Sequence, residues 1–339
     1  MTIEVIRPGL LTSVQDLGRF GMQHFGVPVS GAMDGYALRV ANRLAGNEYN
    51  AAALEVTLAG PVLEFLDDTL VALTGGDLEA AIDGKPLPMH RPVWVARGRR
   101  LSFGRCITGC RAYLAFGGGI DVAPVLGSRS TYVRAALGGL NGRALVAGDR
   151  IIVAGNTQAG SARASCSKLR DLPAFSRDGF AAPRWSVQVR TERLLLRPQR
   201  IRFVAGRHWE YLKAGVRAAF TSENFQVSAS SDRMGYRLEG VRLESGERGE
   251  IHSEAVAFGT VQLPPDGNPI VLMADRQTIG GYPRLGEVAS VDLPLLAQLK
   301  PGDALRFELI DLADAQELAH AQAVALEQIA ASIEAGMSE

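Results

Sequence analysis

Four hydrogen-bonding side chains in a row, at the end of a predicted strand, are the residues of this chain best placed to do chemistry. They are Asp275, Arg276, Gln277 and Thr278, followed by Gly280, Gly281, Tyr282 and Pro283. Adjacent glycines let the backbone approach a ligand closely, and polar side chains at a strand end are held firmly enough to orient a small molecule. A turn in which Asp and Thr cap backbone groups would use the same residues, and spacing alone gives both interpretations equal weight.

These side chains suit the activation of an amide or ureide. Arginine or tyrosine can stabilise the oxyanion that forms on a carbonyl, while a carboxylate handles the proton of the nitrogen. Asp275 is the first candidate for that carboxylate, and Gln277, Thr278 and Tyr282 complete the predicted catalytic set. The sequence has no GxSxG elbow, no HExxH motif and no phosphate loop ending in GK[ST]. Hydrolase and nucleotide-binding sites of those types are therefore not supported.

Three further polar stretches, each containing glycine, supply most of the predicted substrate-binding residues. They are SVQDLGRFG at 13–21, LGSRSTY at 126–132 and SSDRMGYR at 230–237. Together with two glycines that follow Thr278, the candidates are Gln15, Asp16, Arg19, Arg129, Asp232, Arg233, Arg237, Gly280 and Gly281. Unpaired charges are costly to bury, so we expect four charged members to approach the same cleft as Asp275. These four are Asp16, Arg19, Arg233 and Arg237.

Short strands must position these stretches. Residues 259–263 and 269–274 read as two strands joined by the turn sequence PPDGN, which predicts a hairpin directly before Asp275. Residues 13–34 read as an extended loop. Hairpin spacing elsewhere favours antiparallel sheets that form a sandwich or a barrel. Further strands are expected at 3–6, 54–58, 62–66, 70–74, 80–82, 93–96, 99–103, 111–116, 149–153, 186–189, 201–204, 225–227, 236–239 and 303–309.

Helices are fewer than strands in this prediction. Apolar residues at helical spacing from Met33 to Leu44 predict a helix with Ser30 or Asp34 as its N-cap, and for Asp34 we prefer this role over catalysis. A terminal helix is expected from Asp311 to Ala335, capped by Asp311 and stopped at Gly336. One more helix should carry an apolar face made of Trp209, Leu212, Val216 and Phe220.

The predicted fold class is mainly β, a β-rich α+β protein of two subdomains. At 339 residues the chain exceeds one typical domain. We expect a first subdomain at 1–155, a linker at 156–184, a second subdomain at 185–310 and a C-terminal helix at 311–339. Gly148-Asp149 and Gly302-Asp303 each open an apolar strand, which indicates that the two halves are related in plan.

Composition excludes several classes of partner. Lys and Arg together number 36, as do Asp and Glu, so net charge does not favour nucleic acid or an anionic membrane surface. No window approaches the roughly 20 apolar residues of a membrane span, and no signal-peptide pattern is visible, so we expect a cytoplasmic protein. Cys106, Cys110 and Cys166 are too few for a disulfide framework, and the scattered histidines complete no zinc site. We expect no metal.

Four motifs together resemble a known family. They are SVQDLGRFGMQHFGVPVSGAMD, LGSRSTY, SSDRMGYRLEG and GTVQLPPDGNPIVLMADRQTIGGYPRLG. The family is variously called biotin-dependent carboxyltransferase, allophanate hydrolase subunit 2 or the C subunit of 5-oxoprolinase, and the resemblance spans residues 3–310. It implies two subdomains of barrel or sandwich type, the C-terminal one cyclophilin-like.

The resemblance implies two enzymatic settings. One is the carboxyltransferase region of urea carboxylase, which moves a carboxyl group from biotin to urea. The other is a stand-alone component of ATP-dependent 5-oxoprolinase, which opens the lactam of 5-oxo-L-proline to give L-glutamate. We prefer the second, because the chain has no Met-Lys-Met biotinylation site and lacks the companion domain that precedes this region in urea carboxylase.

The preferred setting implies partners. They are a companion that resembles the B subunit of 5-oxoprolinase and a further protein that resembles its A subunit. The complex uses ATP, whereas biotin enters only in the urea carboxylase setting. A third possibility is a non-catalytic regulator, because one family member is similar to an antagonist of a sensor-kinase inhibitor.

Overall fold

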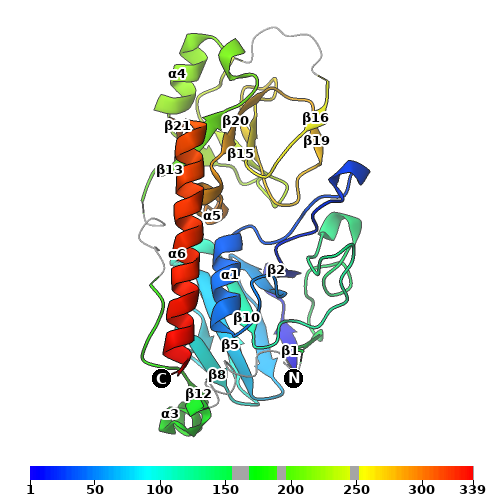
Figure 1. The fold of residues 1–339 in the computed structure, drawn as a ribbon. Coiled ribbons are helices and arrows are strands. Elements are labelled where there is room, and N and C mark those ends of the chain that lie inside the picture. Colours follow the sequence, from blue (N-terminus) through cyan, green and yellow to red (C-terminus); the bar gives the residue numbers. More distant parts are fainter. Residues whose placement is uncertain (155–167, 189–195, 245–251, 339) are drawn as a thin grey trace. The chain divides into compact units, whose positions relative to one another are not determined.

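A computed structural model describes residues 1–154, 168–188, 196–244 and 252–338 (Figure 1). Its contacts divide the chain into two compact units. The first contains Met1–Arg19, Asp34–Arg190 and Ala325–Glu339, and the second contains Phe20–Met33 and Thr191–Val324. We call them the sandwich unit and the barrel unit. The segment Phe20–Met33 thus belongs to the barrel unit, although its neighbours in sequence belong to the sandwich unit.

The sandwich unit contains two six-stranded sheets. The first has the order β11 (Arg150–Ile152), β1 (Thr2–Arg7), β4 (Val62–Phe65), β9 (Arg100–Ser102), β6 (Ala81–Ile82) and β7 (Lys85–Pro86). The second has the order β12 (Phe180–Ala181), β8 (Pro92–Val95), β5 (Thr69–Asp77), β10 (Thr108–Phe116), β3 (Ala53–Thr57) and β2 (Leu11–Gln15). Side chains of both sheets form one buried apolar cluster, so the sheets pack face to face.

Helix α1 (Gly35–Leu44) covers the second sheet by packing against β5 and β10. The Asp34 side chain accepts a hydrogen bond of 2.8 Å from the Ala37 amide, so the predicted N-cap is confirmed. Strand β10 is buried along nearly its whole length because the sandwich core lies on one face and α1 on the other. Its polar side chains on the helix face are therefore also buried.

The barrel unit contains a closed seven-stranded barrel. The parallel pair of β13 and β21 closes it. The order is β13 (Gln199–Ala205), β20 (Arg284–Val288), β17 (Thr260–Gln262), β18 (Ile270–Leu272), β15 (Gly235–Glu239), β14 (Phe225–Val227) and β21 (Ala304–Ile310). Val261 pairs with Val271, so the hairpin predicted before Asp275 is confirmed as β17–β18. A two-stranded ribbon, β16 (Glu254–Ala255) and β19 (Ile279–Gly280), borders the polar loop that follows this hairpin.

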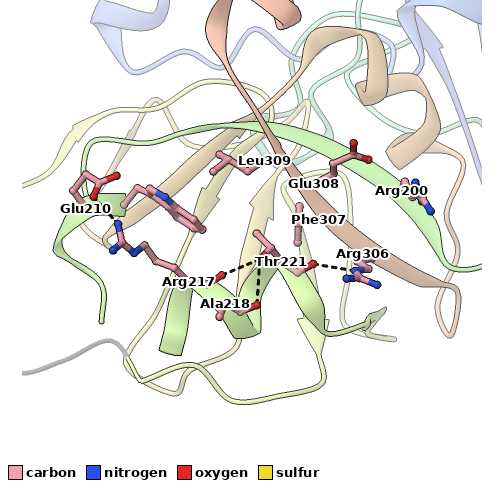
Figure 2. Close-up of a pocket in the computed structure, with 10 residues that line it drawn as sticks. Arg200, Glu210, Arg217, Ala218, Thr221, Arg306, Phe307, Glu308 and Leu309 are labelled. Atoms are coloured by element: carbon pink, nitrogen blue, oxygen red, sulfur yellow. Dashed lines mark hydrogen bonds and ion pairs between the residues drawn. The ribbon is translucent and has the colours of Figure 1, made fainter. Parts of the chain in front are cut away.

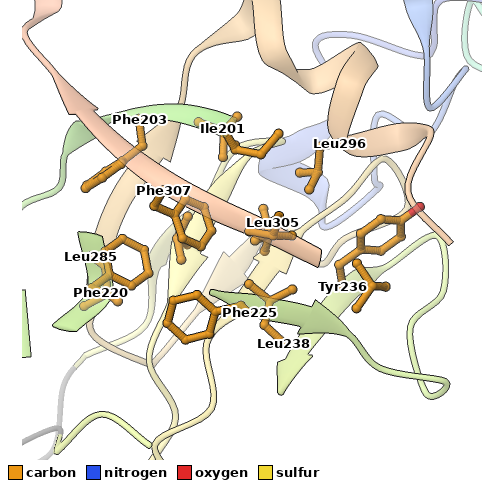
Figure 3. Packing of buried hydrophobic residues seen from close by; sticks show 14 of the residues in the cluster. Ile201, Phe203, Phe220, Phe225, Tyr236, Leu238, Leu285, Leu296, Leu305 and Phe307 are labelled. Atoms are coloured by element: carbon orange, nitrogen blue, oxygen red, sulfur yellow. The ribbon is translucent and has the colours of Figure 1, made fainter. Parts of the chain in front are cut away.

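Aromatic rings fill the barrel (Figure 3). Phe220 stacks on Phe307 with ring centroids 4.4 Å apart, and Phe203 meets Phe220 edge to face at 5.2 Å. Phe220 comes from α4 (Ala214–Ser222), and α5 (Leu293–Ala297) adds further apolar side chains. The predicted apolar face of Trp209, Leu212, Val216 and Phe220 is buried, but a short 3-10 helix (Trp209–Tyr211) and α4 carry it, because Leu212 and Lys213 between them are extended.

The mainly β fold with a C-terminal helix is confirmed, and three further local predictions are wrong. The 13–34 loop begins as strand, since Ser13 and Gln15 lie in β2. No strand forms over the described residues 186–188. The terminal helix α6 (Leu312–Ser338) does not stop at Gly336. A Cβ at Gly336 would lie 2.8 Å from the Trp185 ring. This glycine lies within the helix, and its lack of a side chain lets α6 pack closely against Trp185.

The region expected to be a linker, 156–184, lies partly outside the described residues, as does Cys166. Its described part includes α3 (Pro173–Asp178) and β12, which pairs with β8. Among the described residues, no helix is long and apolar enough to cross a membrane.

Candidate functional site in the barrel unit

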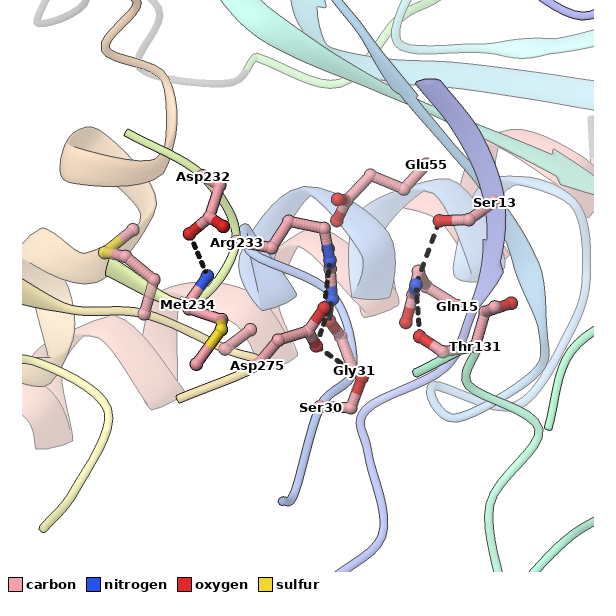
Figure 4. Close-up of polar contacts among 12 residues, drawn as sticks. Ser13, Gln15, Ser30, Gly31, Glu55, Thr131, Asp232, Arg233, Met234 and Asp275 are labelled. Carbon is pink, nitrogen blue, oxygen red and sulfur yellow. Dashed lines mark hydrogen bonds and ion pairs between the residues drawn. The ribbon is translucent and has the colours of Figure 1, made fainter. Parts of the chain in front are cut away.

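Asp275 is held by a buried ion pair at the end of the β17–β18 hairpin (Figure 4). Arg233 donates from Nε to Asp275 Oδ2 at 2.9 Å and from Nη2 to Oδ1 at 3.0 Å. The Asp275 amide also donates to the Arg233 carbonyl at 2.8 Å. Both side chains are buried, and the geometry is the bidentate one that gives Arg–carboxylate pairs their strength.

The N-terminal segment of the barrel unit completes this clamp (Figure 4). Ser30 donates from Oγ to Asp275 Oδ1 at 2.6 Å, and Arg233 Nη2 donates to the Gly31 carbonyl at 2.7 Å. Ser30 and Gly31, which are not among the predicted site residues, thus bring this segment to the Asp275 clamp. The Asp275 carboxylate accepts three side-chain hydrogen bonds, which fix its position and occupy most of its accepting capacity.

The other members of the predicted catalytic set lie on the rim of this loop. Gln277 and Tyr282 are exposed and Thr278 is half-buried. The Thr278 carbonyl accepts a hydrogen bond from the Val256 amide at 3.1 Å, which ties the loop to the β16–β19 ribbon. Gly280 lies within that ribbon and Gly281 is exposed beside it. These side chains are available to a ligand and are anchored through their backbone.

Arg276 stands in the polar run but outside the predicted catalytic set, and it is buried beneath the same loop. It is 9% exposed, and its Nη1 makes long contacts of 3.4 Å and 3.5 Å to the Met273 and Ala274 carbonyls. Burial lowers the pKa of the Arg276 guanidinium to about 10, partly offset by the charges of Glu287 and Asp275. Its place in the DRQTIGG motif was a sequence signal for a functional role, but the burial of its side chain was not predictable from the motif.

In the sandwich unit, two of the predicted polar stretches join around Asp16. Oδ1 accepts hydrogen bonds from the Ser128 and Ser130 hydroxyls and from the Gly18 amide, and Oδ2 accepts one from the Arg129 amide at 2.6 Å. Asp16 is 1% exposed. This carboxylate therefore acts as a buried connector between β2 and the 126–132 stretch.

The neighbours of Asp16 make similar internal bonds. Arg19 donates from Nη2 to the Ser130 carbonyl, and the Arg129 side chain donates from Nε to the Val122 carbonyl at 3.0 Å. Gln15 donates to Ser13 Oγ at 2.9 Å and to the Thr131 carbonyl at 3.1 Å (Figure 4). Residues 13–19 and 126–132 thus form one hydrogen-bonded cluster within the sandwich unit.

Asp232 and Arg237 lie on either side of Arg233 in the sequence. The Asp232 carboxylate accepts from the Met234 amide at 2.8 Å, which is a local turn (Figure 4). Arg237 points out of β15 and is exposed. The structure thus brings Arg233 to Asp275. The proposed convergence of Asp16, Arg19 and Arg237 on the same cleft stays a prediction.

Glu55 was not predicted and lies buried on the helix face of the second sheet. Tyr113 donates from its hydroxyl to Glu55 Oε2 at 2.7 Å and accepts from the Asp34 amide at 2.7 Å. Burial raises the pKa of Tyr113 well above its usual value. The sequence signal for this residue was a glutamate within the mainly apolar strand sequence ALEVT, which indicates a buried carboxylate. The group ties the start of α1 to β3 and β10.

A cavity of about 680 Å³ lies elsewhere on the barrel, between α4 and β21 (Figure 2). Its charged groups are largely paired, since Arg217 binds Glu210 and Arg306 donates from Nε to the Thr221 carbonyl at 2.9 Å. None of the predicted site residues lines it. Within the described part of the chain, no group of three or more His, Cys, Asp or Glu side chains is placed to hold a metal ion.

Comparison with known proteins identifies clear relatives of the chain. It is 37% identical to the C subunit of 5-oxoprolinase from Escherichia coli over 328 residues, which cover 97% of each chain. It is 35% identical to urea amidolyase of Saccharomyces cerevisiae over 96% of this chain but only 18% of that protein. The crystal structure of Kluyveromyces lactis urea carboxylase superposes with a TM-score of 0.80 at 32% identity, over 97% of this chain and 29% of that one.

A family model described as carboxyltransferase domain, subdomain A and B, matches residues 25–309, and this range includes the clamp and the 275–283 loop. The resemblance drawn from the four motifs is confirmed. The chain belongs to the carboxyltransferase-domain family that includes the C subunit of 5-oxoprolinase and the corresponding region of urea carboxylase.

Proposed function

We propose that this chain is one component of an ATP-dependent 5-oxoprolinase, which opens the lactam of 5-oxo-L-proline to give L-glutamate. The observation that carries the proposal is the match to the C subunit of the Escherichia coli 5-oxoprolinase, which extends over 97% of both chains. The urea amidolyase match is similar in identity but leaves most of that longer protein without a counterpart here. A second match of nearly full length, to the C subunit of 5-oxoprolinase from Haemophilus influenzae at 35% identity, supports the same assignment.

In this proposal the 275–283 loop contacts the substrate. The exposed or half-buried side chains of Gln277, Thr278 and Tyr282 supply hydrogen bonds to the substrate. Asp275 is now assigned as a positioning residue, because its carboxylate already accepts bonds from Arg233 and Ser30. A general base needs an accessible lone pair directed at the proton it removes, and the clamp occupies that position.

Partners are part of the proposal. The relatives are named as subunits of 5-oxoprolinase, which supports a complex with a companion like its B subunit and a protein like its A subunit. ATP is used by that complex.

Reconstitution tests the proposal directly. The chain is mixed with its two candidate companions, ATP and 5-oxo-L-proline, and released glutamate is measured with each component omitted in turn. We expect glutamate only when all components are present. Full glutamate release without this chain would remove the assignment.

The structural match to urea carboxylase favours one alternative, a carboxyltransferase component served by a separate biotin carrier. The two functions differ in their requirement for biotin. Adding avidin to the reconstituted mixture abolishes a biotin-dependent reaction and leaves a 5-oxoprolinase reaction unchanged.

A further inference from the structure

The outer face of the barrel at β17 and β20 gathers polar side chains. Thr260 pairs with Glu287 and Gln262 pairs with Arg284, and the register shifts between these two pairs. Val261, between them on β17, points into the barrel core. Because side chains alternate along a strand, Thr260 and Gln262 point outward.

The register shift brings two charged residues of β20 to this same outer face. Leu285 is the extra residue of a β-bulge, so Arg284 and Glu287 both lie opposite outward-pointing partners, with their side chains 3.8 Å apart. Bulges commonly re-aim side chains beside active sites. Without the bulge, regular alternation of side chains along β20 would point Arg284 and Glu287 to opposite faces. With it, both lie on the outer face and form a polar surface there.

Arg276 belongs to the loop whose Gly280 backbone lies against Gln262, and it has unused hydrogen-bonding capacity. Its Nε is buried and has no hydrogen-bond partner among the described residues. Its charge interacts with Glu287 and Asp275, but the Asp275 carboxylate is already paired with Arg233. Burying a guanidinium with an unsatisfied donor is costly. A ligand that supplies an acceptor would remove that cost.

Gln262 also has a buried hydrogen-bond donor without a partner among the described residues. It is 4% exposed, and its Nε2 has no partner within the part of the chain that the structure describes. A Cβ at Gly280 would lie only 2.3 Å from this nitrogen. Glycine at 280, one of the two glycines that drew attention in the sequence, is therefore needed for the Gln262 amide to occupy its position beneath the loop.

Glu287 supplies an acceptor beside these donors. Thr260 donates from its hydroxyl to Glu287 Oε2 at 2.7 Å, and the ion pair to Arg284 is long. An inorganic anion would meet this carboxylate unfavourably. A neutral group that carries a carbonyl oxygen next to an N–H would match both kinds of partner.

We propose that Arg276, Gln262 and Glu287 form the recognition site for the N–C=O group of a small amide. Arg276 Nε and Gln262 Nε2 donate to the carbonyl oxygen, and Glu287 accepts from the N–H. The choice of amide as ligand class rests on the proposed function; the unsatisfied donors and the acceptor rest on geometry alone. A lactam and a ureide share this chemistry, so both are tested.

Ligand-observed NMR on the full chain, without companions or ATP, tests the site. The probes are 5-oxo-L-proline, urea, 2-pyrrolidone and N-methyl-2-pyrrolidone, the last being a lactam without an N–H. We expect 2-pyrrolidone to bind at least about ten-fold more tightly than its N-methyl analogue, because the analogue has no N–H to donate to the charged Glu287 carboxylate. Equal binding of these two lactams, or binding of none of the probes, would overturn the proposal.

Matched variants locate the binding. Arg276→Met and Gly280→Ala should each weaken 2-pyrrolidone binding about ten-fold or more, since each removes or displaces a donor. Gly215→Ala is the control, because a Cβ there meets nothing within 4 Å. Glu287→Met should abolish the preference for 2-pyrrolidone over its N-methyl analogue. Unchanged binding in folded Arg276→Met and Gly280→Ala proteins would reject the site.

The outcome is separable from that of the proposed function. Binding of 2-pyrrolidone and urea without glutamate release in the reconstituted mixture would support the recognition site and reject the 5-oxoprolinase assignment. Glutamate release that is unaffected by Gly280→Ala would support the 5-oxoprolinase assignment and reject the recognition site.

Discussion

The Asp16 loop of the sandwich unit and the 275–283 loop of the barrel unit look alike in sequence, but their hydrogen bonding differs. Both follow a strand, and both combine charged side chains with glycine. Asp16 accepts four hydrogen bonds from its own unit. Arg276 and Gln262, in contrast, keep buried donors without partners among the described residues.

This difference separates two uses of polar residues. Native proteins satisfy nearly all buried polar groups, so each exception calls for an explanation. The Asp16 carboxylate, whose four hydrogen bonds lie within its own unit, stabilises the sandwich unit, although Oε1 of its neighbour Gln15 is buried without a partner among the described residues. The unsatisfied donors beneath the 275–283 loop are suited to a ligand. Density of polar residues in the sequence does not distinguish the two cases, whereas the hydrogen bonding of the Asp16 carboxylate and of the Arg276 guanidinium does.

The largest expected effect is on stability, at Asp16. Asp16→Ala leaves two hydroxyls and two amides without their shared acceptor in a buried position. We expect a loss of about 3–5 kcal/mol in the free energy of unfolding, measured by denaturant titration. Asp266→Ala is the control, because its carboxylate accepts a hydrogen bond from the Asn268 amide at 3.0 Å in an exposed turn. If Asp16→Ala were no less stable than Asp266→Ala, the structural role of the Asp16 cluster would be refuted.

Asp275 needs a double-mutant cycle. Asp275→Asn directs an amide NH₂ toward a buried Arg233 donor, so the single variant should lose about 2–4 kcal/mol by leaving a buried cation poorly paired. If Asp275 only positions the loop, adding Arg233→Gln should restore much of both stability and reconstituted activity. A double variant that regains its stability but stays inactive would show that the carboxylate takes part in the reaction.

Much of the fold was predictable because its signals are local. Alternation and turn residues identified the β17–β18 hairpin, and Asp34 was recognised as a helix cap. Strand β2 was missed because Ser13 and Gln15 look like loop residues. Gln15 can be buried there because it donates to the Thr131 carbonyl, 116 positions away in sequence. A partner that distant leaves no local pattern.

The candidate site was only partly predictable. The motif drew attention to the 275–283 loop, and the pairing of Arg233 with Asp275 was anticipated as a meeting of charges. Arg276 was noted in the polar run but left out of the catalytic set, because nothing local indicates that an arginine will be buried. Glu287 and Gln262 were missed for a related reason, since the β-bulge that shapes their face is visible only in the strand register.

Glu287 gives a smaller effect that depends on pH. Burial raises the pKa of Glu287 above its ordinary value of 4.5, and the Thr260 hydroxyl, Arg284 and Arg276 only partly offset this. The folded state therefore holds the proton more tightly than the unfolded state. The associated stability is full below pH 4.5 and is lost as pH rises through the folded-state pKa.

Glu287→Gln cannot ionise and should remove this loss. We expect the stability of the variant relative to the natural protein to increase from pH 4.5 upward and then to level off, as measured by denaturant titration at each pH. A difference that is flat across this range would contradict the sign of the shift. Glu308→Gln, on β21, is the control.

The smallest expected effect concerns a turn that the two units share. Gly148 and Gly302 have φ of +86° and +87°. The aspartate that follows each glycine accepts a hydrogen bond through its side chain: Asp149 from the Val146 amide and Asp303 from the Lys300 amide. In the sandwich unit Asp149 also forms a bidentate pair with Arg143 at 2.7 Å and 2.8 Å. In the barrel unit Asp303 contacts Lys300 at 3.2 Å. The turns are alike, but the ion pairs differ in geometry.

The two ion pairs should therefore differ in their response to acid. The hydrogen bond from Arg143 lowers the pKa of Asp149, so its stabilisation is present above pH 3.8 and is lost as pH falls through the folded-state pKa. Exposed pairs contribute little, so Asp149→Asn should cost at most about 1 kcal/mol at neutral pH, with the cost shrinking in acid. Asp303→Asn preserves the corresponding cap and is the matched variant. If Asp149→Asn cost as much below its folded-state pKa as at neutral pH, the cap and not the ion pair would account for the stabilisation.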